Sequence, residues 1–365
     1  MYEICPICDG VETRRLLRLR QQPASSALLP SAAAARAVKS ADIGLRYCPS
    51  CDHLYNDLFD SADSRYPRAH PLPAYAQEFF QYITRRFPLK GKQVIDVGTM
   101  DGRLLVELAQ MGSRGIGLVP SGAADVPDIT WIDRPFSRDY LNLPADLVLC
   151  RQTPQHVWNV RDLFRNLHAL AFDWHAPVLF EAQNSHAMLN ARDVWSLRYE
   201  RCHYFSPRSL WQAVKAVRFT PTMQTQPCDG QLLSLLTMPL ATPLHLPPPD
   251  AVSLIPFLDA IQLNVAEWTA TLGQMRQQQD RVVLWGASER AVTFLNALPT
   301  RGVVACVVDD ESAETFIPRT AHPVRPIAFL TELAPHVIII MDEKSRDDVE
   351  RLLPSLSHMP TIMNA

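Results

Sequence analysis

The residues VIDVGTMDGRLLVELAQMGSRGIGLV, at positions 94–119, contain two short apolar runs with a helical segment between them. The first run ends in a glycine turn, and the second, GIGLV, begins soon after another glycine. Apolar runs of about four to eight residues that alternate with helices are typical of β-α-β units, whose strands lie parallel in one sheet. The pattern predicts that a parallel α/β sheet begins here.

The alternation continues on the C-terminal side, in the order TWID (130–133), ADLVLC (145–150), VRDLFRNLHALAF (160–172) and APVLFEA (176–182). On the N-terminal side, residues 74–87 place apolar and aromatic side chains at helical spacing, which predicts a lead-in helix. A helix capped near Ser206 precedes QLLSLLTM (231–238), a run that we expect to pair antiparallel at the sheet edge. We therefore predict a doubly wound, Rossmann-like central domain.

A proline-rich segment, ATPLHLPPPDA at 241–251, predicts a domain boundary, because connectors of this composition are extended and semi-rigid. A long amphipathic helix is expected over 252–280. A second alternation follows it, with strands predicted near 281–285, 303–308 and 336–341. The pattern indicates a smaller Rossmann-like sheet in the C-terminal part.

The overall composition excludes several classes of protein. Apolar residues make up 47% of the 365 residues and charged residues 20%, which is typical of a globular chain. The net charge of −3 disfavours binding to nucleic acid or to an anionic membrane surface. The opening MYEICPICDG lacks the pattern of a signal peptide, and no stretch approaches the roughly 20 apolar residues that span a bilayer. We expect a cytoplasmic protein with neither nucleic acid nor membrane as partner.

Two CxxC pairs lie in the first 55 residues. CPIC contributes Cys5 and Cys8, and CPSC contributes Cys48 and Cys51. In a reducing compartment four such thiolates predict a tetrahedral Zn²⁺ site, and four protein ligands make it structural because no coordination position stays open. The Ala-, Ser- and Pro-rich stretch between the pairs, residues 23–40, is expected to bulge outward as an insertion of low complexity, and His53 is expected at the surface beside the second pair.

These patterns together predict an α/β protein in three parts. A zinc-binding domain occupies residues 1–58, and the central Rossmann-like domain with its lead-in helix occupies 59–240. The linker, the long helix and the smaller Rossmann-like domain occupy 241–365.

The glycine turn after the first strand has the spacing Gly98-x-x-x-Gly102. Such a turn exposes backbone N–H groups beside the positive end of a helix and can hold the polar end of a ligand. The third glycine of the dinucleotide fingerprint is missing, since Arg103 or Leu104 stands there. The spacing favours a methyl-donor pocket over NAD, and the alternative is a plain structural turn.

The order of motifs resembles that of a known family. CPIC, CPSCDHLYN, VIDVGTMDGRLLVEL, GIGLVPS, RQTPQHV, YERCHYFSPRSL and WGASERAVTFLNAL follow one another as in the zinc-containing, S-adenosylmethionine-dependent sugar C-methyltransferases. The resemblance covers nearly the whole chain. It implies S-adenosylmethionine as cofactor, one structural Zn²⁺, and methylation of a carbon next to the carbonyl of a nucleotide-linked keto-deoxysugar or related small molecule, which the C-terminal domain helps to hold.

The resemblance also implies a cofactor site. Asp96, Gly98, Asp101 and Gly102 match the family's cofactor loop, Asp133 follows the third strand where it can accept from the adenine amino group, and Arg151 and His156 fall in the motif after the fourth strand. The chain departs from the pattern at Val119, where the family has an acid that holds the ribose hydroxyls. A valine side chain cannot accept those hydrogen bonds.

The motif of the catalytic segment departs further. Aligned on YFS, the chain has RYERCHYFS, which keeps Glu200 and places Arg201 where the family has its histidine base. Because a guanidinium stays protonated, Arg201 is a candidate to stabilise an enolate, and Glu200 or His203 is a candidate base. His203 is equally consistent with a hydrogen-bonded core or surface histidine. Tyr66 resembles the family's tyrosine that contacts the enolate or the base.

The sequence leaves two alternatives to C-methylation. A non-catalytic binding or partner protein is consistent with the changes at Val119 and Arg201. Methyl transfer to an oxygen or nitrogen tolerates the missing histidine, because it needs no strong carbon-acid base. In the C-terminal part, Gly286 and Ala287 open a helix after a strand, and His322 and Arg325 are expected at the rim of that sheet.

Overall fold

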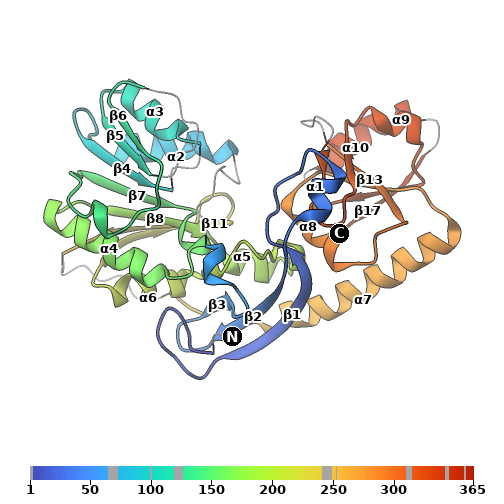
Figure 1. Cartoon of the computed structure of the whole chain (residues 1–365), viewed down its shortest axis with the longest axis horizontal. Helices are drawn as coiled ribbons and strands as arrows, with labels where there is room; N and C mark the ends of the chain where they lie inside the picture. Colours follow the sequence, from blue (N-terminus) through green and yellow to red (C-terminus); the bar gives the residue numbers. More distant parts are fainter. Residues whose placement is uncertain are drawn as a thin grey trace. The chain divides into compact units, whose positions relative to one another are not determined.

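The computed structural model describes residues 3–64, 73–98, 101–118, 126–240, 249–251, 253–309, 315–341, 345–356 and 359–365. The chain forms two compact units. The first contains residues 1–17, 44–188 and 201–253, and the second contains 18–43, 189–200 and 254–365. Figure 1 shows the elements of both units. Among the described residues, no helix combines the length and the apolar composition needed to cross a membrane.

The first unit contains the predicted doubly wound sheet, whose strands lie in the order β10-β11-β8-β7-β4-β5-β6. β11 runs opposite to the other six strands of this sheet. The strands are β4 (Gln93–Val97), β5 (Arg114–Leu118), β6 (Ile129–Ile132), β7 (Leu147–Arg151), β8 (Val178–Gln183), β10 (Thr220–Thr225) and β11 (Leu232–Met238). The helices are α2 (Pro73–Arg86), α3 (Arg103–Gln110), α4 (Val160–Trp174), α5 (Ser185–Asn190) and α6 (Pro207–Ala216), with single turns η1 (Ser61–Asp63), η2 (Arg138–Tyr140) and η3 (Pro154–His156).

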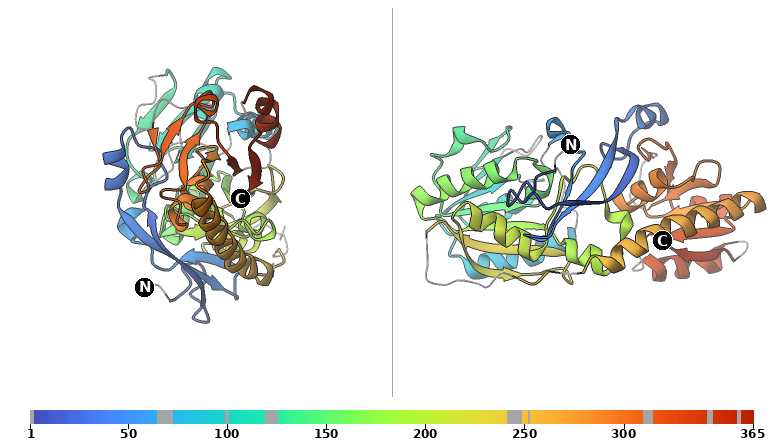
Figure 2. Two further views of the ribbon diagram at one scale, coloured as in Figure 1. Left: turned by 90° about the vertical axis from the view of Figure 1, so that its right-hand side faces the viewer. Right: turned by 90° about the horizontal axis from the view of Figure 1, so that it is seen from below.

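Helices cover both faces of this sheet, as Figure 1 and Figure 2 show. Successive side chains of a strand point to opposite faces, so one strand contributes to two cores. Leu147 and Leu149 of β7 pack with α2 and α3, whereas Val148 and Cys150 pack with α4 and α6. Because both faces are buried, the central strands β4, β5, β7 and β8 are mostly apolar. This explains why continuous apolar runs marked them in the sequence.

A smaller sheet contains β1 (Arg14–Pro23), β2 (Ser40–Cys48), β3 (His53–Asn56) and β9 (His203–Tyr204), in that order. The antiparallel pairing of β3 with β9 joins the cysteine-rich N-terminal segment to the segment that precedes α6. Leu54 lies opposite Tyr204, and Tyr55 lies opposite His203. The position of residues 203 and 204 therefore depends on β3, the strand that follows the second CxxC pair.

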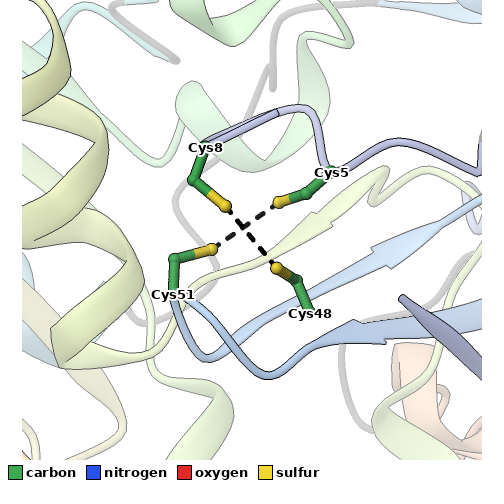
Figure 3. A group of neighbouring side chains, drawn as sticks. All are labelled: Cys5, Cys8, Cys48 and Cys51. Atoms are coloured by element: carbon green, nitrogen blue, oxygen red, sulfur yellow. Dashed lines mark hydrogen bonds between the residues drawn. The ribbon is translucent and has the colours of Figure 1, made fainter. Parts of the chain in front are cut away.

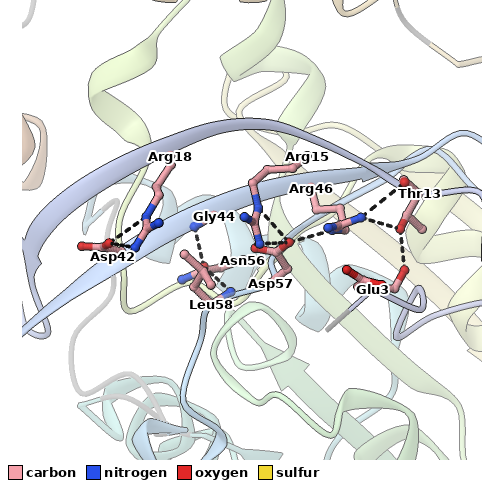
Figure 4. Close-up of polar contacts among 10 residues, drawn as sticks. All are labelled: Glu3, Thr13, Arg15, Arg18, Asp42, Gly44, Arg46, Asn56, Asp57 and Leu58. Carbon is pink, nitrogen blue, oxygen red and sulfur yellow. Dashed lines mark hydrogen bonds and ion pairs between the residues drawn. The ribbon is translucent and has the colours of Figure 1, made fainter. Parts of the chain in front are cut away.

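Asp57 is a buried carboxylate at the end of β3, and two arginines from neighbouring strands hold it (Figure 4). Arg15 Nη2 lies 2.7 Å and Arg46 Nε lies 2.6 Å from Asp57 Oδ2. On the other side, a Cβ atom at Gly44 would overlap Asp57 Oδ1 and would lie 2.9 Å from Leu58 Cγ. Gly44 therefore makes the space that the carboxylate occupies.

The second unit contains the smaller Rossmann-like sheet, in the order β14-β15-β13-β12-β16-β17. Its strands are β12 (Val282–Trp285), β13 (Val304–Val308), β14 (Thr315–Phe316), β15 (Pro323–Arg325), β16 (Val337–Ile340) and β17 (Thr361–Asn364). Its helices are α1 (Ala32–Ala37), α7 (Ile255–Gln278), α8 (Glu289–Ala297), α9 (Phe329–Leu333) and α10 (Arg346–Leu352), with single turns η4 (Val194–Ser196) and η6 (Leu353–Ser355). Figure 2 shows α7 as one long helix. The predicted mixed α/β fold with two such sheets is confirmed.

The stretch at 23–40 has more regular structure than its composition suggested. It contains the end of β1, the helix α1 and the start of β2, and the Ser31 hydroxyl caps α1 by accepting from Ala34 N–H. Backbone hydrogen bonds join it to the strands of the second unit: Leu29 and Phe316 exchange a pair, and Arg319 N–H donates to Ala35 O. Ala35, which accepts one of these bonds, is fully buried.

The space around Asp57 leads to a prediction. Substituting Gly44→Ala should destabilise the protein by about 1–3 kcal/mol, because two arginines prevent Asp57 from moving away from the new methyl group. Gly273→Ala in α7 is the control, since its Cβ would meet no atom within 4 Å and alanine favours helix. Urea unfolding followed by circular dichroism measures both. An unchanged midpoint for Gly44→Ala would contradict the packing described.

Candidate active site and metal site

Four cysteine sulfurs converge between the N-terminal turn and the turn that follows β2 (Figure 3). The Sγ atoms of Cys5 and Cys51 lie 3.6 Å apart, those of Cys8 and Cys48 lie 3.5 Å apart, and all four lie within 4.8 Å of one another. Tetrahedral zinc with Zn–S bonds of about 2.3 Å places its sulfurs about 3.8 Å apart. The four side chains therefore fit a zinc ion.

The surroundings of these cysteines are typical of a structural site. Cys5, Cys48 and Cys51 are buried, while Cys8 is exposed. Asp9, next to Cys8, accepts hydrogen bonds from Arg161 of α4, which fixes the first turn against the large sheet's unit. A zinc ion with four thiolate ligands has no open position for substrate, so it would stabilise this segment and take no part in the reaction.

The large sheet has a topological switch point between β4 and β7. The chain continues from β4 to β5 and β6 on one side, and then returns to β7 and β8 on the other. In open α/β sheets ligands bind at the carboxyl ends of the strands at such a point. Asp96 and Gly98 lie at the end of β4, and Arg151 ends β7. The structure thus brings three predicted cofactor residues to this edge.

The loop after β4 contains two glycines whose backbone angles other residues rarely adopt. Gly98 has φ +74° and Gly102, the N-cap of α3, has φ +72°, in a region that favours glycine. A Cβ atom at Gly102 would also lie 2.8 Å from the Trp131 ring. Asp101 is exposed and its Oδ1 accepts from Arg103 N–H, which orders the first turn of α3.

Arg151 and Asp96 form a buried ion pair at this edge. Arg151 Nη2 donates to Asp96 Oδ2 at 3.0 Å, and the guanidinium lies over the Phe79 ring, 4.8 Å from its centroid. Burial raises the pKa of Asp96, and the neighbouring Arg151 charge opposes that rise. Arg151 therefore fixes the position of the Asp96 carboxylate.

Asp133 follows β6 at the same edge of the sheet and is exposed, so its carboxylate is accessible to a ligand. Val119 follows β5 and lies outside the described residues. Tyr66, expected near the substrate, also lies outside them.

His203 lies in the core of the first unit, and both of its ring nitrogens are hydrogen bonded. Nδ1 is 3.0 Å from His53 Nε2, and Nε2 is 3.0 Å from Trp158 O. Because a carbonyl only accepts, His203 Nε2 carries the proton and Nδ1 accepts from His53. Burial lowers the pKa of His203 to about 4. This geometry matches the core-histidine alternative and leaves no nitrogen available to a substrate proton.

His53 is fully buried, so its expected place at the surface was wrong. Its ring packs against Tyr55, Phe205 and the His203 ring. Burial lowers its pKa well below the ordinary histidine value. The two histidines therefore form a neutral pair in an aromatic core, where neither is exposed to water.

Arg201 and Glu200 differ in their surroundings. Arg201 is 5% exposed, and its Nε atom has no hydrogen-bond partner among the described residues. The adjacent Cys202 is fixed by backbone hydrogen bonds, its N–H donating to Gln155 O and its carbonyl accepting from Asn56 N–H. Glu200 is half-buried and belongs to the second unit.

A buried polar chain near Arg151 was not found from the sequence. Gln155 Nε2 donates to Gln152 Oε1 at 3.1 Å, and Gln152 Nε2 donates to Glu181 Oε1 at 2.9 Å. His156, partly exposed, lies at the outer end with its Nε2 3.4 Å from Gln155 Nε2. The one available signal was a charged residue, Glu181, inside the otherwise apolar strand VLFEAQ.

In the second unit, a backbone N–H group in the turn between β12 and α8 already donates a hydrogen bond to a side chain of the protein. Gly286 has φ +91°, and Ala287 N–H donates to Asp309 Oδ2 at 2.7 Å. Arg325 ends β15 and is partly exposed. His322 directly precedes β15 and is buried, and burial lowers its pKa to about 4.

Two family models match parts of the chain. Residues 69–223 match a family model described as a methyltransferase domain. Residues 251–356 match a family model described as a C-methyltransferase C-terminal domain. No curated protein sequence matches the chain.

Solved structures of methyltransferases are similar at low identity. Magnesium protoporphyrin IX methyltransferase from Synechocystis PCC 6803, solved with bound S-adenosylhomocysteine, has 13% identity and a TM-score of 0.36, over 45% of this chain and 82% of that one. An S-adenosylmethionine-dependent methyltransferase from Aquifex aeolicus has 12% identity and a TM-score of 0.34, over 46% and 98%. The Burkholderia thailandensis 1,6-didemethyltoxoflavin-N1-methyltransferase has 13% and 0.32, over 46% and 77%.

The sulfur geometry predicts one zinc ion per chain. Metal analysis of purified protein should give about one equivalent of zinc, and Cys48→Ser should lose it and lower the unfolding temperature. Cys228→Ser is the control, because Cys228 lies outside the cluster. Zinc below about half an equivalent in wild type, with unchanged stability of Cys48→Ser, would contradict the assignment.

The glycine loop predicts where the cofactor binds. Gly98→Leu should abolish S-adenosylmethionine binding in calorimetry, because a side chain fills the space next to the backbone at the end of β4. Gly112→Ala is the control, since it also has positive φ but its Cβ would lie 3.6 Å from the nearest atom, in Lys90. If folded Gly98→Leu binds as tightly as wild type, the cofactor site is elsewhere.

Proposed function

We propose that this S-adenosylmethionine-dependent methyltransferase transfers the methyl group to a carbon next to the ketone of a nucleotide-linked deoxysugar. One observation carries the proposal: the segment after the methyltransferase domain matches the C-terminal domain of C-methyltransferases, at residues 251–356. The order of motifs in the sequence supports the same substrate class. The second Rossmann-like sheet would then help to hold the nucleotide sugar.

The carboxyl edge of the large sheet supports a site for the methyl donor. In this proposal Asp96, Gly98, Asp101 and Gly102 surround its amino-acid end, Arg151 fixes Asp96, and Asp133 accepts from the adenine amino group. The fit rests on two observations. Two glycines in the loop have positive φ, and the buried Asp96 Oδ1 has no hydrogen-bond partner among the described residues. When bound, S-adenosylmethionine supplies an electrophilic methyl carbon.

The proposed reaction needs a base and a group that stabilises negative charge. Glu200 accepts the proton from the α-carbon, and the electrons of the C–H bond form an enolate. Arg201, a cation at all relevant pH values and only 5% exposed, stabilises the enolate oxygen. S-adenosylmethionine held at the carboxyl edge would supply the methyl group to the enolate carbon, and the electron pair of the methyl–sulfur bond would stay on sulfur. Glu200 is the proposed base because both nitrogens of His203 are engaged.

A second candidate function is binding without methyl transfer. It is favoured by one observation: the histidine nearest to the family's base position is buried and hydrogen bonded, so it cannot replace that base. Exchange of the substrate α-hydrogen with deuterium from solvent distinguishes the two functions. It requires the base and the enolate but no methyl donor.

The catalytic roles lead to a prediction. Glu200→Gln should lower both α-hydrogen exchange and methyl transfer by about 100-fold or more, whereas calorimetry should show unchanged S-adenosylmethionine binding. A panel of nucleotide-linked 3-keto and 4-keto deoxysugars supplies the substrates. Glu267→Gln, an exposed carboxylate on α7, is the control.

Two results would contradict these assignments. Full exchange and full methylation by Glu200→Gln would show that another group is the base. Absence of both activities in the wild-type protein on every sugar of the panel would favour the binding function.

A further inference from the structure

The backbone next to Arg201 is fixed at the carboxyl edge of the large sheet. Cys202, the residue that follows, donates its N–H to Gln155 O at 2.9 Å, and its carbonyl accepts from Asn56 N–H at 3.0 Å. Gln155 belongs to η3, the turn that follows β7 at that edge, and Asn56 ends β3. Residues 201 and 202 are therefore held between this turn and the end of β3.

The side chain of Arg201 is buried without a partner for its charge. The residue is 5% exposed and its Nε atom is enclosed. None of its three side-chain nitrogens has a hydrogen-bond or ion-pair partner among the described residues. The two Nη atoms are not enclosed, so the end of the guanidinium faces a small opening to solvent.

The other two arginines that are buried in the described part of the chain each pair with a carboxylate. Arg151 pairs with Asp96, and Arg198 pairs with Glu289. A buried charge without such a partner is costly, because the protein interior solvates it less well than water does. The unpaired guanidinium of Arg201 therefore indicates a site for an anion that the chain itself does not supply.

The chemistry of the guanidinium favours one kind of anion. The enolate of the proposed reaction is negative only during the reaction, whereas bound substrate covers the opening at Arg201 beforehand. A neutral sugar would then leave the cation with neither water nor a partner. A diphosphate carries more negative charge than one guanidinium compensates. One carboxylate matches it in charge, and its two oxygens accept two parallel hydrogen bonds from the planar fork.

We propose that Arg201 binds a carboxylate of the methyl acceptor, which makes the acceptor a nucleotide-linked keto-sugar acid with the carboxylate near its ketone. The inference rests on the proposed function and narrows its substrate class. The guanidinium holds the carboxylate when the substrate binds, and it faces the neighbouring enolate oxygen when the α-carbon has lost its proton. Arg201 thereby determines which keto-sugars enter the site.

Calorimetry without methyl donor tests the proposal with two matched pairs of ligands. These are the glucuronates and the glucoses linked to uridine diphosphate and to thymidine diphosphate, which differ within each pair by the carboxylate. The wild-type protein should bind the acid of at least one pair about tenfold or more tightly than the neutral sugar. Arg201→Met should remove this preference, and Arg165→Met, at an exposed arginine of α4, should keep it.

Thermal unfolding of the free protein tests the unpaired state itself. Arg201→Met should leave the unfolding temperature unchanged or raise it, because it removes a buried cation and leaves no carboxylate without its partner. Arg151→Met should lower the unfolding temperature, because it leaves the Asp96 carboxylate buried and unpaired.

Three results would overturn the inference. Equal affinity for acid and neutral sugar in wild type would show that the site does not recognise a carboxylate. Equal weakening of both by Arg201→Met would show that Arg201 holds the diphosphate that they share. A lower unfolding temperature of Arg201→Met, as for Arg151→Met, would show that the protein supplies its partner. Binding of the neutral sugars without preference for the acids leaves the proposed function intact, whereas binding of none of the four contradicts both.

Discussion

The ion pair between Arg151 and Asp96 is the interaction on which the carboxyl edge of the large sheet depends. A guanidinium that is 3% exposed needs a partner charge, and Asp96 provides one at 3.0 Å. Removing either partner would leave an uncompensated charge in the core, which costs about 3–5 kcal/mol. Because the pair joins the ends of β4 and β7, it also fixes the strand from which the Gly98 turn begins.

The cysteine cluster acts on the same unit from the N-terminal side. Cys48 ends β2, β2 pairs with β3, and β3 pairs with β9, so a metal bound there would stabilise the strand that contains His203. In that strand, the neutral His203 side chain forms hydrogen bonds with His53 and with the Trp158 carbonyl. Arg201 lies two residues before His203. A structural metal bound by the four cysteines can therefore influence the position of residues 201–204 without touching a substrate.

Local patterns in the sequence predicted much of this. The alternation of apolar runs and helices gave both sheets, because each parallel strand is buried on two faces. The doubled CxxC predicted the cluster of four cysteine sulfurs, since the spacing itself brings two thiolates to each turn. The order of motifs gave the methyltransferase class, which the family matches confirm. The strands and each CxxC turn depend on residues that are neighbours in the chain.

The remaining features depend on residues far apart in the chain. His203 resembled a base because its partners, His53 and Trp158, lie 150 and 45 residues away. Glu181 drew no attention because its partners come from α2 and from the loop after β7. The stretch at 23–40 resembled an irregular insertion because its backbone bonds to residues 316 and 319. No local pattern records these contacts.

The central claim is that the carboxyl edge of the large sheet, next to the buried ion pair of Asp96 and Arg151, binds the methyl donor. A crystal structure of the zinc-loaded protein with S-adenosylhomocysteine tests it most directly. We expect the amino-acid end of the ligand beside Gly98 and Gly102 and its adenine beside Asp133. A nucleoside bound instead at the smaller sheet, beside Gly286, would contradict the claim.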